Sequence, residues 1–137
     1  MAGGVLVGFA GAEAVLSGFT GQGLGSTLML DTDSLDATGE ERDSQGILAQ
    51  LTYSLGATKF GVAYGANEMD ETAAERGVRA GGGNSELESQ SMLTLGLYHD
   101  LNAHLKLVAE YSQARNEWFG GQEQEGDILS VGTFFTW

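Results

Sequence analysis

The sequence predicts an all-β chain that forms part of an antiparallel transmembrane β-barrel. Apolar residues recur at every second position in several segments, which is the period of a strand whose two faces meet different environments. The less apolar face of these segments is mostly Gly, Ser, Thr and Gln, which suits a crowded, hydrated barrel interior better than a surface in water. Short and long connections alternate along the chain, as in outer-membrane barrels. The 137 residues form a single barrel region, 1–137.

The clearest strand places Leu93, Leu95 and Leu97 on one face and Thr94 on the other. Two weaker strands begin the chain, and five stronger ones follow. The expected strands lie near residues 4–9, 13–21, 46–55, 58–65, 90–99, 104–113 and 127–137. Bacterial single-chain barrels have even strand counts from 8 upward, so a set of about seven needs further strands or copies of the chain. We therefore expect an incomplete barrel.

The connections between these strands differ in length and charge. Residues 56–57 and 100–103 are predicted to be short turns, and residues 31–44, 66–89 and 113–126 are predicted to be long polar loops. Many of the acids, including Asp31 and Asp33, lie in these loops. The loops carry too little apolar surface to fold alone. The run Gly81-Gly82-Gly83 is expected to be mobile.

The composition excludes several classes of function. The formal net charge of −13, with 6 Lys plus Arg, repels nucleic-acid phosphates. With no Cys, the chain has no disulfide framework and no cysteine zinc site. Residues 1–19 are apolar and include the small-x-small pattern Ala10-Gly11-Ala12, but no basic residue precedes Arg42. A strand cut by truncation is therefore favoured over a signal peptide.

Three segments, residues 17–27, 42–65 and 98–111, resemble Gram-negative porins, particularly those of gammaproteobacteria. Residues 129–137 resemble the C-terminal signal that the barrel-assembly machinery reads, with Trp137 where Phe is commoner. The resemblance implies the C-terminal portion of a sixteen-stranded outer-membrane porin, usually a homo-trimer, in contact with lipid and lipopolysaccharide. It also implies passive diffusion of small hydrophilic solutes and ions.

The candidate site residues fall into two groups by face. Lys59, Lys106 and Glu110 lie on the predicted inner face, where they either line the pore or form a structural ion pair between Lys106 and Glu110. The aromatics of the apolar face are expected to form a lipid-facing girdle at the membrane interfaces. They are Tyr53, Tyr64, Tyr111, Phe135 and Trp137.

No pattern in the sequence predicts an enzyme, a cofactor or a metal site. His99 and His104 flank a predicted turn but lack a third ligand. The loop acids lack the apolar walls that raise a catalytic pKa. Besides a porin-like channel, two interpretations stay open: a non-conducting surface barrel of the outer membrane, and a soluble secreted β-domain with acidic loops.

Overall fold

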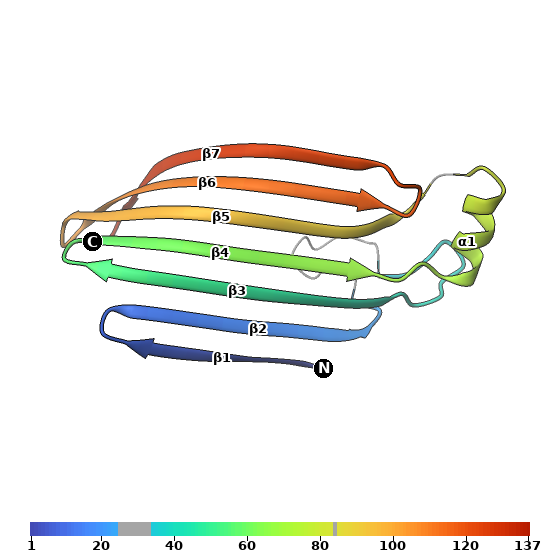
Figure 1. The fold of residues 1–137 in the computed structure, drawn as a ribbon, viewed down its shortest axis with the longest axis horizontal. Helices are drawn as coiled ribbons and strands as arrows, with labels where there is room; N and C mark the ends of the chain where they lie inside the picture. Colours follow the sequence, from blue (N-terminus) through green and yellow to red (C-terminus); the bar gives the residue numbers. More distant parts are fainter. Residues whose placement is uncertain (25–33, 84) are drawn as a thin grey trace.

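The computed structural model describes residues 1–24, 34–83 and 85–137, which form one antiparallel sheet with a short helix at one end (Figure 1). The strands follow the order of the sequence, β1 to β7, so each pairs with its neighbour in the chain. They are β1 (Ala2–Phe9), β2 (Ala12–Gln22), β3 (Asp43–Leu55), β4 (Thr58–Met69), β5 (Leu87–Asn102), β6 (Leu105–Trp118) and β7 (Glu123–Phe135). The all-β prediction and the seven up-and-down strands are confirmed. Asp31 and Asp33 lie outside the described residues.

The register of the sheet gives it two distinct faces. Residues directly opposite each other in an antiparallel pair point to the same side. Leu95 lies opposite Val62 on β4 and Tyr111 on β6, and Tyr111 lies opposite Leu129 on β7. The side that carries these residues is called the outer face, and the side that carries Thr94 is called the inner face.

Three tight turns lie at one end of the sheet, which we call the turn end (Figure 1). Ala10 and Gly11 connect β1 to β2 with φ of 49° and 85°, the left-handed conformation that a two-residue hairpin turn favours. The small-x-small pattern noted in the sequence is thus a hairpin turn. Between β5 and β6 the Asn102 side chain accepts a hydrogen bond from the His104 backbone at 2.8 Å. The turn is at residues 103–104, so only Ala103 of the predicted turn 100–103 lies in it.

The long connections lie at the opposite end, called the loop end, and the prediction of a third long loop was wrong. Residues 113–126 are mostly strand, because β6 continues to Trp118 and β7 begins at Glu123. Gln113 and Arg115 are polar, but they stay paired with β5 and β7. These strands therefore extend beyond the apolar part of the sheet, and polar composition alone did not distinguish such an extension from a loop.

A helix, α1 (Ala73–Ala80), interrupts the connection between β4 and β5, where the sequence had predicted only a loop. Thr72 and Glu75 form a reciprocal capping box at its N-terminus. This Thr-x-x-Glu spacing is visible in the sequence and was missed. The glycines expected to be mobile end the helix: the Gly83 backbone N–H donates to the Val78 carbonyl at 2.9 Å, and Gly82 has a φ of 84°.

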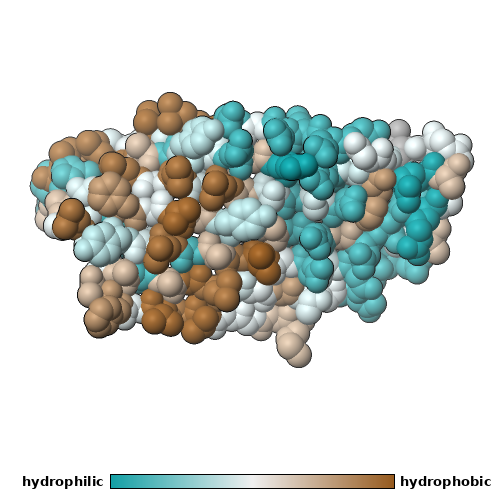
Figure 2. All heavy atoms as spheres, viewed as in Figure 1, coloured by the Kyte–Doolittle hydropathy of each residue, from teal (hydrophilic) through white to brown (hydrophobic). Residues whose placement is uncertain are grey.

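The sheet has no apolar core of its own. Met69 is the single buried apolar residue within the three described ranges, whereas Leu95 is 50% exposed and Val131 79% exposed. Figure 2 shows apolar residues gathered over the half near the turn end and polar residues over the half near α1. None of the described helices is both long and apolar enough to traverse a bilayer. The outer face of the isolated sheet therefore needs to be covered by an apolar partner or an apolar solvent.

Candidate functional site: a two-faced wall

The boundary between apolar and polar residues runs obliquely across the outer face. One row of paired residues, perpendicular to the strands, reads Ile47, Ala66, Ser91, Arg115 and Glu125 from β3 to β7. The row is apolar on β3 and β4 and charged on β6 and β7. If the strands stood upright, a boundary parallel to the membrane plane would run along such a row. The boundary crosses the row instead, which indicates that the strands are tilted from the membrane normal, as barrel strands are.

The apolar part of the outer face has the height of a membrane. On β3 it runs from Ile47 to Leu55. At a rise of about 3.3 Å per residue and a tilt of about 40°, these residues cover roughly 20–25 Å. The apolar band of outer-membrane barrels is about 25 Å tall.

The predicted girdle aromatics are all solvent-exposed in the isolated sheet. The register places Tyr53, Tyr64, Tyr111 and Phe135 on the outer face, and the Trp137 ring lies 6.4 Å from the Phe135 ring. The Tyr111 hydroxyl donates to Asp127 at 2.7 Å, at the limit of the apolar band that faces the loop end. Such a tyrosine has its ring beside apolar residues and its hydroxyl among polar ones. Its role at the lipid headgroups stays a prediction.

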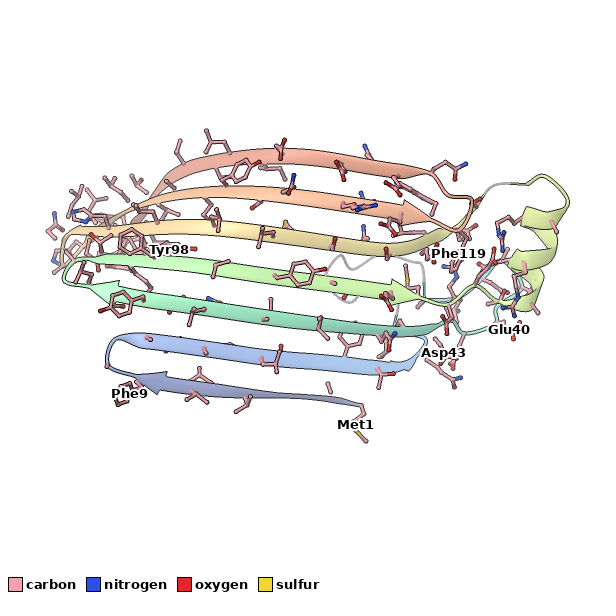
Figure 3. All side chains as sticks on the ribbon, viewed as in Figure 1. Met1, Phe9, Glu40, Asp43, Tyr98 and Phe119 are labelled. Atoms are coloured by element: carbon pink, nitrogen blue, oxygen red, sulfur yellow. The ribbon has the colours of Figure 1, made fainter. Side chains whose placement is uncertain are left out.

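On the inner face, Tyr98 covers two glycines and reaches Glu110. Glu110 lies opposite Gly96, and the Tyr98 hydroxyl donates to its carboxylate at 2.5 Å. A Cβ on Gly96 would lie 2.7 Å from that hydroxyl, and one on Gly61 would lie 3.6 Å from the ring. The missing side chains therefore make room for the tyrosine, which Figure 3 places near the turn end. Lys59 lies opposite Tyr98 on β4.

The suggested ion pair between Lys106 and Glu110 is not formed. Two inner-face residues four apart on one strand are about 13 Å apart along it. Asp100 lies directly opposite Lys106 instead, and the two side chains are 3.4 Å apart. Both side chains are more than one-third exposed, so this pair stabilises the sheet little.

The rest of the inner face mixes polar and apolar side chains. Thr94 and Ser112 share a hydrogen bond of 2.8 Å between β5 and β6. The register also places apolar side chains on this face, so it is less uniformly polar than the sequence pattern suggested. These include Leu6, Leu48, Met92, Ile128 and Phe134.

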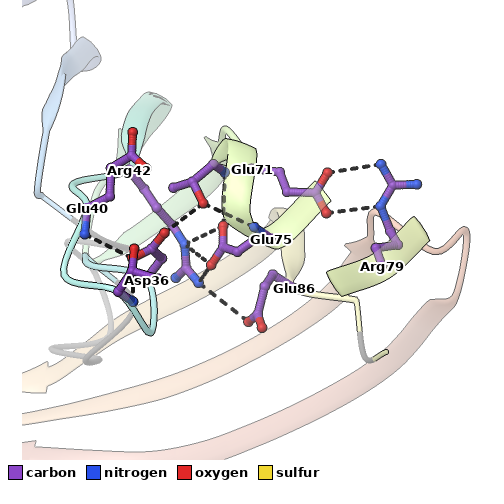
Figure 4. Close-up of polar contacts among 9 residues, drawn as sticks. Asp36, Glu40, Arg42, Glu71, Glu75, Arg79 and Glu86 are labelled. Atoms are coloured by element: carbon purple, nitrogen blue, oxygen red, sulfur yellow. Dashed lines mark hydrogen bonds and ion pairs between the residues drawn. The ribbon is translucent and has the colours of Figure 1, made fainter. Parts of the chain in front are cut away.

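At the loop end a polar cluster, buried except for Glu86, joins two connections that are distant in the sequence (Figure 4). Arg42 Nε donates to both Glu75 oxygens at 3.0 and 3.2 Å, and Arg42 also lies 3.6 Å from Glu86. The Thr72 hydroxyl donates to Asp36 at 2.8 Å. These five residues are called the loop cluster. Beside it, Arg79 donates to Glu71 through two hydrogen bonds of 2.9 Å.

The loop cluster holds the carboxylates of Asp36 and Glu75 in the charged form, because the pKa of each is lowered. A hydrogen bond from the Thr38 side chain is the main cause that lowers the pKa of Asp36. Burial alone would raise the pKa of Glu75, but hydrogen bonds from Arg42 and from the Thr72 backbone outweigh it and lower the pKa. A hydrogen bond from Arg79 lowers the pKa of Glu71. The cluster is thus built around ionised acids.

The loop cluster should loosen in acid. Because the folded pKa values of Asp36 and Glu75 lie below the ordinary values of 3.8 and 4.5, their contribution to stability is complete above about pH 4.5. It is lost progressively as the pH falls through the lowered values. Amide exchange in α1, corrected for its intrinsic pH dependence, should show less protection at pH 3 than at pH 7. Equal protection at both values would contradict the cluster.

The two histidines have separate partners. His99 Nδ1 lies 2.9 Å from the Thr58 hydroxyl, and His104 Nδ1 lies 2.9 Å from the Thr136 carbonyl oxygen. In the described residues, no group of three or more His, Cys, Asp or Glu side chains is arranged to hold a metal ion.

Comparison with known proteins gives two matches. The family model described as "Gram-negative porin" matches residues 6–118. Among solved structures, the chain is similar to the outer membrane channel DcaP of Acinetobacter baumannii, with a TM-score of 0.83 and 16% identity. The match covers 97% of this chain and 39% of that one, so this chain spans well under half of the channel. A search of the curated proteins found no match.

The family match agrees with the two-faced sheet and excludes one of the interpretations of the sequence. It covers most of the chain, and its family is non-enzymatic and belongs to the Gram-negative outer membrane. A soluble secreted β-domain is thereby set aside, in agreement with the exposed apolar outer face. The chain belongs to the Gram-negative porin family.

Proposed function

We propose that this chain is part of the wall of an outer-membrane channel through which small hydrophilic solutes and ions diffuse passively. The observation that supports this most is the division of one sheet into two faces. The outer face is an apolar band of membrane height, and the inner face carries Lys59, Lys106, Glu110 and the hydrogen-bonded Thr94–Ser112 pair. Such a wall separates lipid from a water-filled lumen.

The charges of the wall and mouth favour cations. On the inner face near the turn end, the acids Glu13, Asp100 and Glu110 outnumber the bases Lys59 and Lys106. At the loop end a cavity of about 580 Å³ is lined by more acids than bases. The acids are Glu40, Glu41, Asp43, Asp70 and Glu71, and the bases are Arg42, Arg76 and Arg79. An excess of one sign concentrates the opposite ion at a channel mouth.

Conductance tests this function. The protein isolated from outer membranes, together with whatever strands complete its barrel, should give stepwise currents in a planar bilayer. Under a salt gradient the reversal potential should indicate that cations pass more easily. Silent membranes that contain demonstrably inserted protein would instead favour a non-conducting surface barrel.

A pair of matched variants tests the inner position of Glu110. Glu110→Gln should reduce the cation preference, because it removes an acid from the lumen. Glu125→Gln removes the same charge from the outer face of β7, where it lies opposite Arg115. If the two variants shift the reversal potential equally, Glu110 does not line the pore.

The remaining features of the proposal concern the whole protein. The chain corresponds to the C-terminal portion of a porin of the gammaproteobacterial kind, in contact with outer-membrane lipid and lipopolysaccharide. The segment from β7 to Trp137 engages the barrel-assembly machinery, and the complete barrel forms a homo-trimer. The aromatic C-terminus is exposed in the structure, which supports its recognition by the barrel-assembly machinery.

A further inference from the structure

A row of four amide side chains crosses the inner face near the loop end. The row runs from β4 to β7 with one residue on each strand, because each member lies directly opposite the next. Gln90 comes four positions before Thr94 on β5, so the row shares the inner face with Thr94. Its members, which we call the amide row, are Asn67, Gln90, Asn116 and Gln124.

The strands that carry this row keep their charges on the opposite face. Where β6 and β7 extend beyond the apolar band, their charged residues all lie on the outer face. These are Arg115, Glu117, Glu123, Glu125 and Asp127. Their neighbours on the inner face are Ala114, Asn116, Gln124 and Gly126. A need for hydration alone does not explain this difference, because charged side chains would hydrate either face.

Charge is absent from three successive rows of the inner face, and each row runs across all seven strands. One row contains the amide row, the next contains Met92, and the third contains Thr94. By register, none of the three has an Asp, Glu, Lys or Arg on any strand, β1 to β7. We call these rows the neutral zone. Charge returns in the following row, with Glu13 and Glu110.

The middle row of the neutral zone is apolar and leaves space over the backbone. A Cβ on Gly126 would meet nothing within 4 Å, and one on Gly65 would meet nothing closer than 3.8 Å. The amide row and the hydrogen-bonded Thr94–Ser112 pair lie on either side, each about 6–7 Å away along the strands. A solute here can rest on an apolar surface and form hydrogen bonds at both of its ends.

Asn67 is the buried member of the amide row, and its side chain makes no hydrogen bond with the described residues. The residue is 6% exposed, and its amide oxygen shares the space over Gly46 with the Phe19 ring. Within the row, the single hydrogen bond runs from Gln90 Nε2 to Asn116 Oδ1 at 3.2 Å. A buried amide without a partner is costly, so a hydroxyl group that reaches Asn67 is favoured there.

We infer that the neutral zone is a subsite for uncharged, hydroxyl-rich solutes, the chemical class of sugars and polyols. A primary amide both donates and accepts hydrogen bonds, as a hydroxyl group does, so the two can pair in either direction. An ion gains less, because the zone has no opposite charge to offset its lost hydration. The inference rests on the proposed channel wall and names a class of solute that its lumen retains.

Sucrose tests the subsite in a planar bilayer that contains the complete channel isolated from outer membranes. The ion current should fall as sucrose is added and then level off, after correction for the conductivity of the solution. A methyl-capped oligo(ethylene glycol) of similar mass accepts hydrogen bonds but donates none, and its curve should not level off. If the two solutes give the same curve, the inference is wrong.

Matched leucine variants locate the subsite. Gln90→Leu and Asn116→Leu each remove one amide from the row. Each should raise the half-saturating sucrose concentration roughly five-fold, the value of about one hydrogen bond. Gln113→Leu makes the same change as Gln90→Leu on the outer face, opposite Leu93, and should leave that concentration unchanged. Equal shifts for Gln90→Leu and Gln113→Leu, or none for either amide-row variant, would overturn the subsite.

The current without sucrose separates this inference from the proposed function, and it also shows that each variant has folded. A channel that conducts but shows no saturable response to sucrose would overturn the subsite alone. Silent membranes with inserted protein would overturn the channel wall, and the subsite with it.

Discussion

Leu51→Arg should destabilise the inserted sheet, whereas Gln50→Arg, one residue earlier, should not. Leu51 lies on the outer face, inside the apolar band, opposite Ala14 and Val62. An arginine near the middle of the bilayer on the lipid side costs about 2–4 kcal/mol in barrels. The loss should appear as a lower urea midpoint for unfolding from liposomes.

The matched variant makes this result specific. Gln50 is exposed on the inner face, opposite Val15 and Ala63, so an arginine there stays in water. We expect its urea midpoint to stay close to that of the parent chain. If the two variants lose the same stability, the two faces do not meet different solvents.

Arg42→Met should open the loop cluster. The side chains of Arg42 and Glu75 are 9% and 10% exposed, so the variant leaves a buried carboxylate without its cation. Breaking a buried pair in this way costs about 3–5 kcal/mol, and we expect about 2–3 kcal/mol here because the cluster borders water. Amide exchange in α1 should become roughly 30- to 150-fold faster.

Two further variants separate charge from packing. Arg42→Lys keeps the charge but loses the two-pronged hydrogen bond to Glu75, so its effect should be smaller. The double variant Arg42→Met/Glu75→Met removes both charges and should recover part of the protection of α1, because it also removes the Glu75 side chain that accepts the capping hydrogen bond from the Thr72 backbone N–H. A double variant as labile as Arg42→Met alone would contradict an uncompensated carboxylate as the cause.

The strands and their faces could be predicted because a strand has a period of two. Leu93, Leu95 and Leu97 show the outer face without any knowledge of their neighbours. Alternation also placed Lys59, Lys106 and Glu110 on one side, where the register has them. Strand ends were harder, since the polar extensions around Arg115 have the composition of loops.

The loop cluster could not be predicted, because its contacts join residues far apart in the chain. Arg42 and Glu75 lie 33 positions apart, and nothing near either residue indicates the other. The Lys106–Asp100 pair was missed for a related reason: the partner lies across a turn whose length the sequence did not define. The capping box at Thr72, by contrast, was a local signal that the sequence did contain.

Spin labels at single cysteines on β5 test the central claim most directly. With labels at residues 93, 94, 95 and 97 in liposomes, positions 93, 95 and 97 should be accessible to oxygen dissolved in lipid. Position 94 should be accessible to a water-soluble nickel complex. Leucine positions shielded from both reagents would mean that the outer face packs in a protein core, and would contradict a sheet that separates lipid from water.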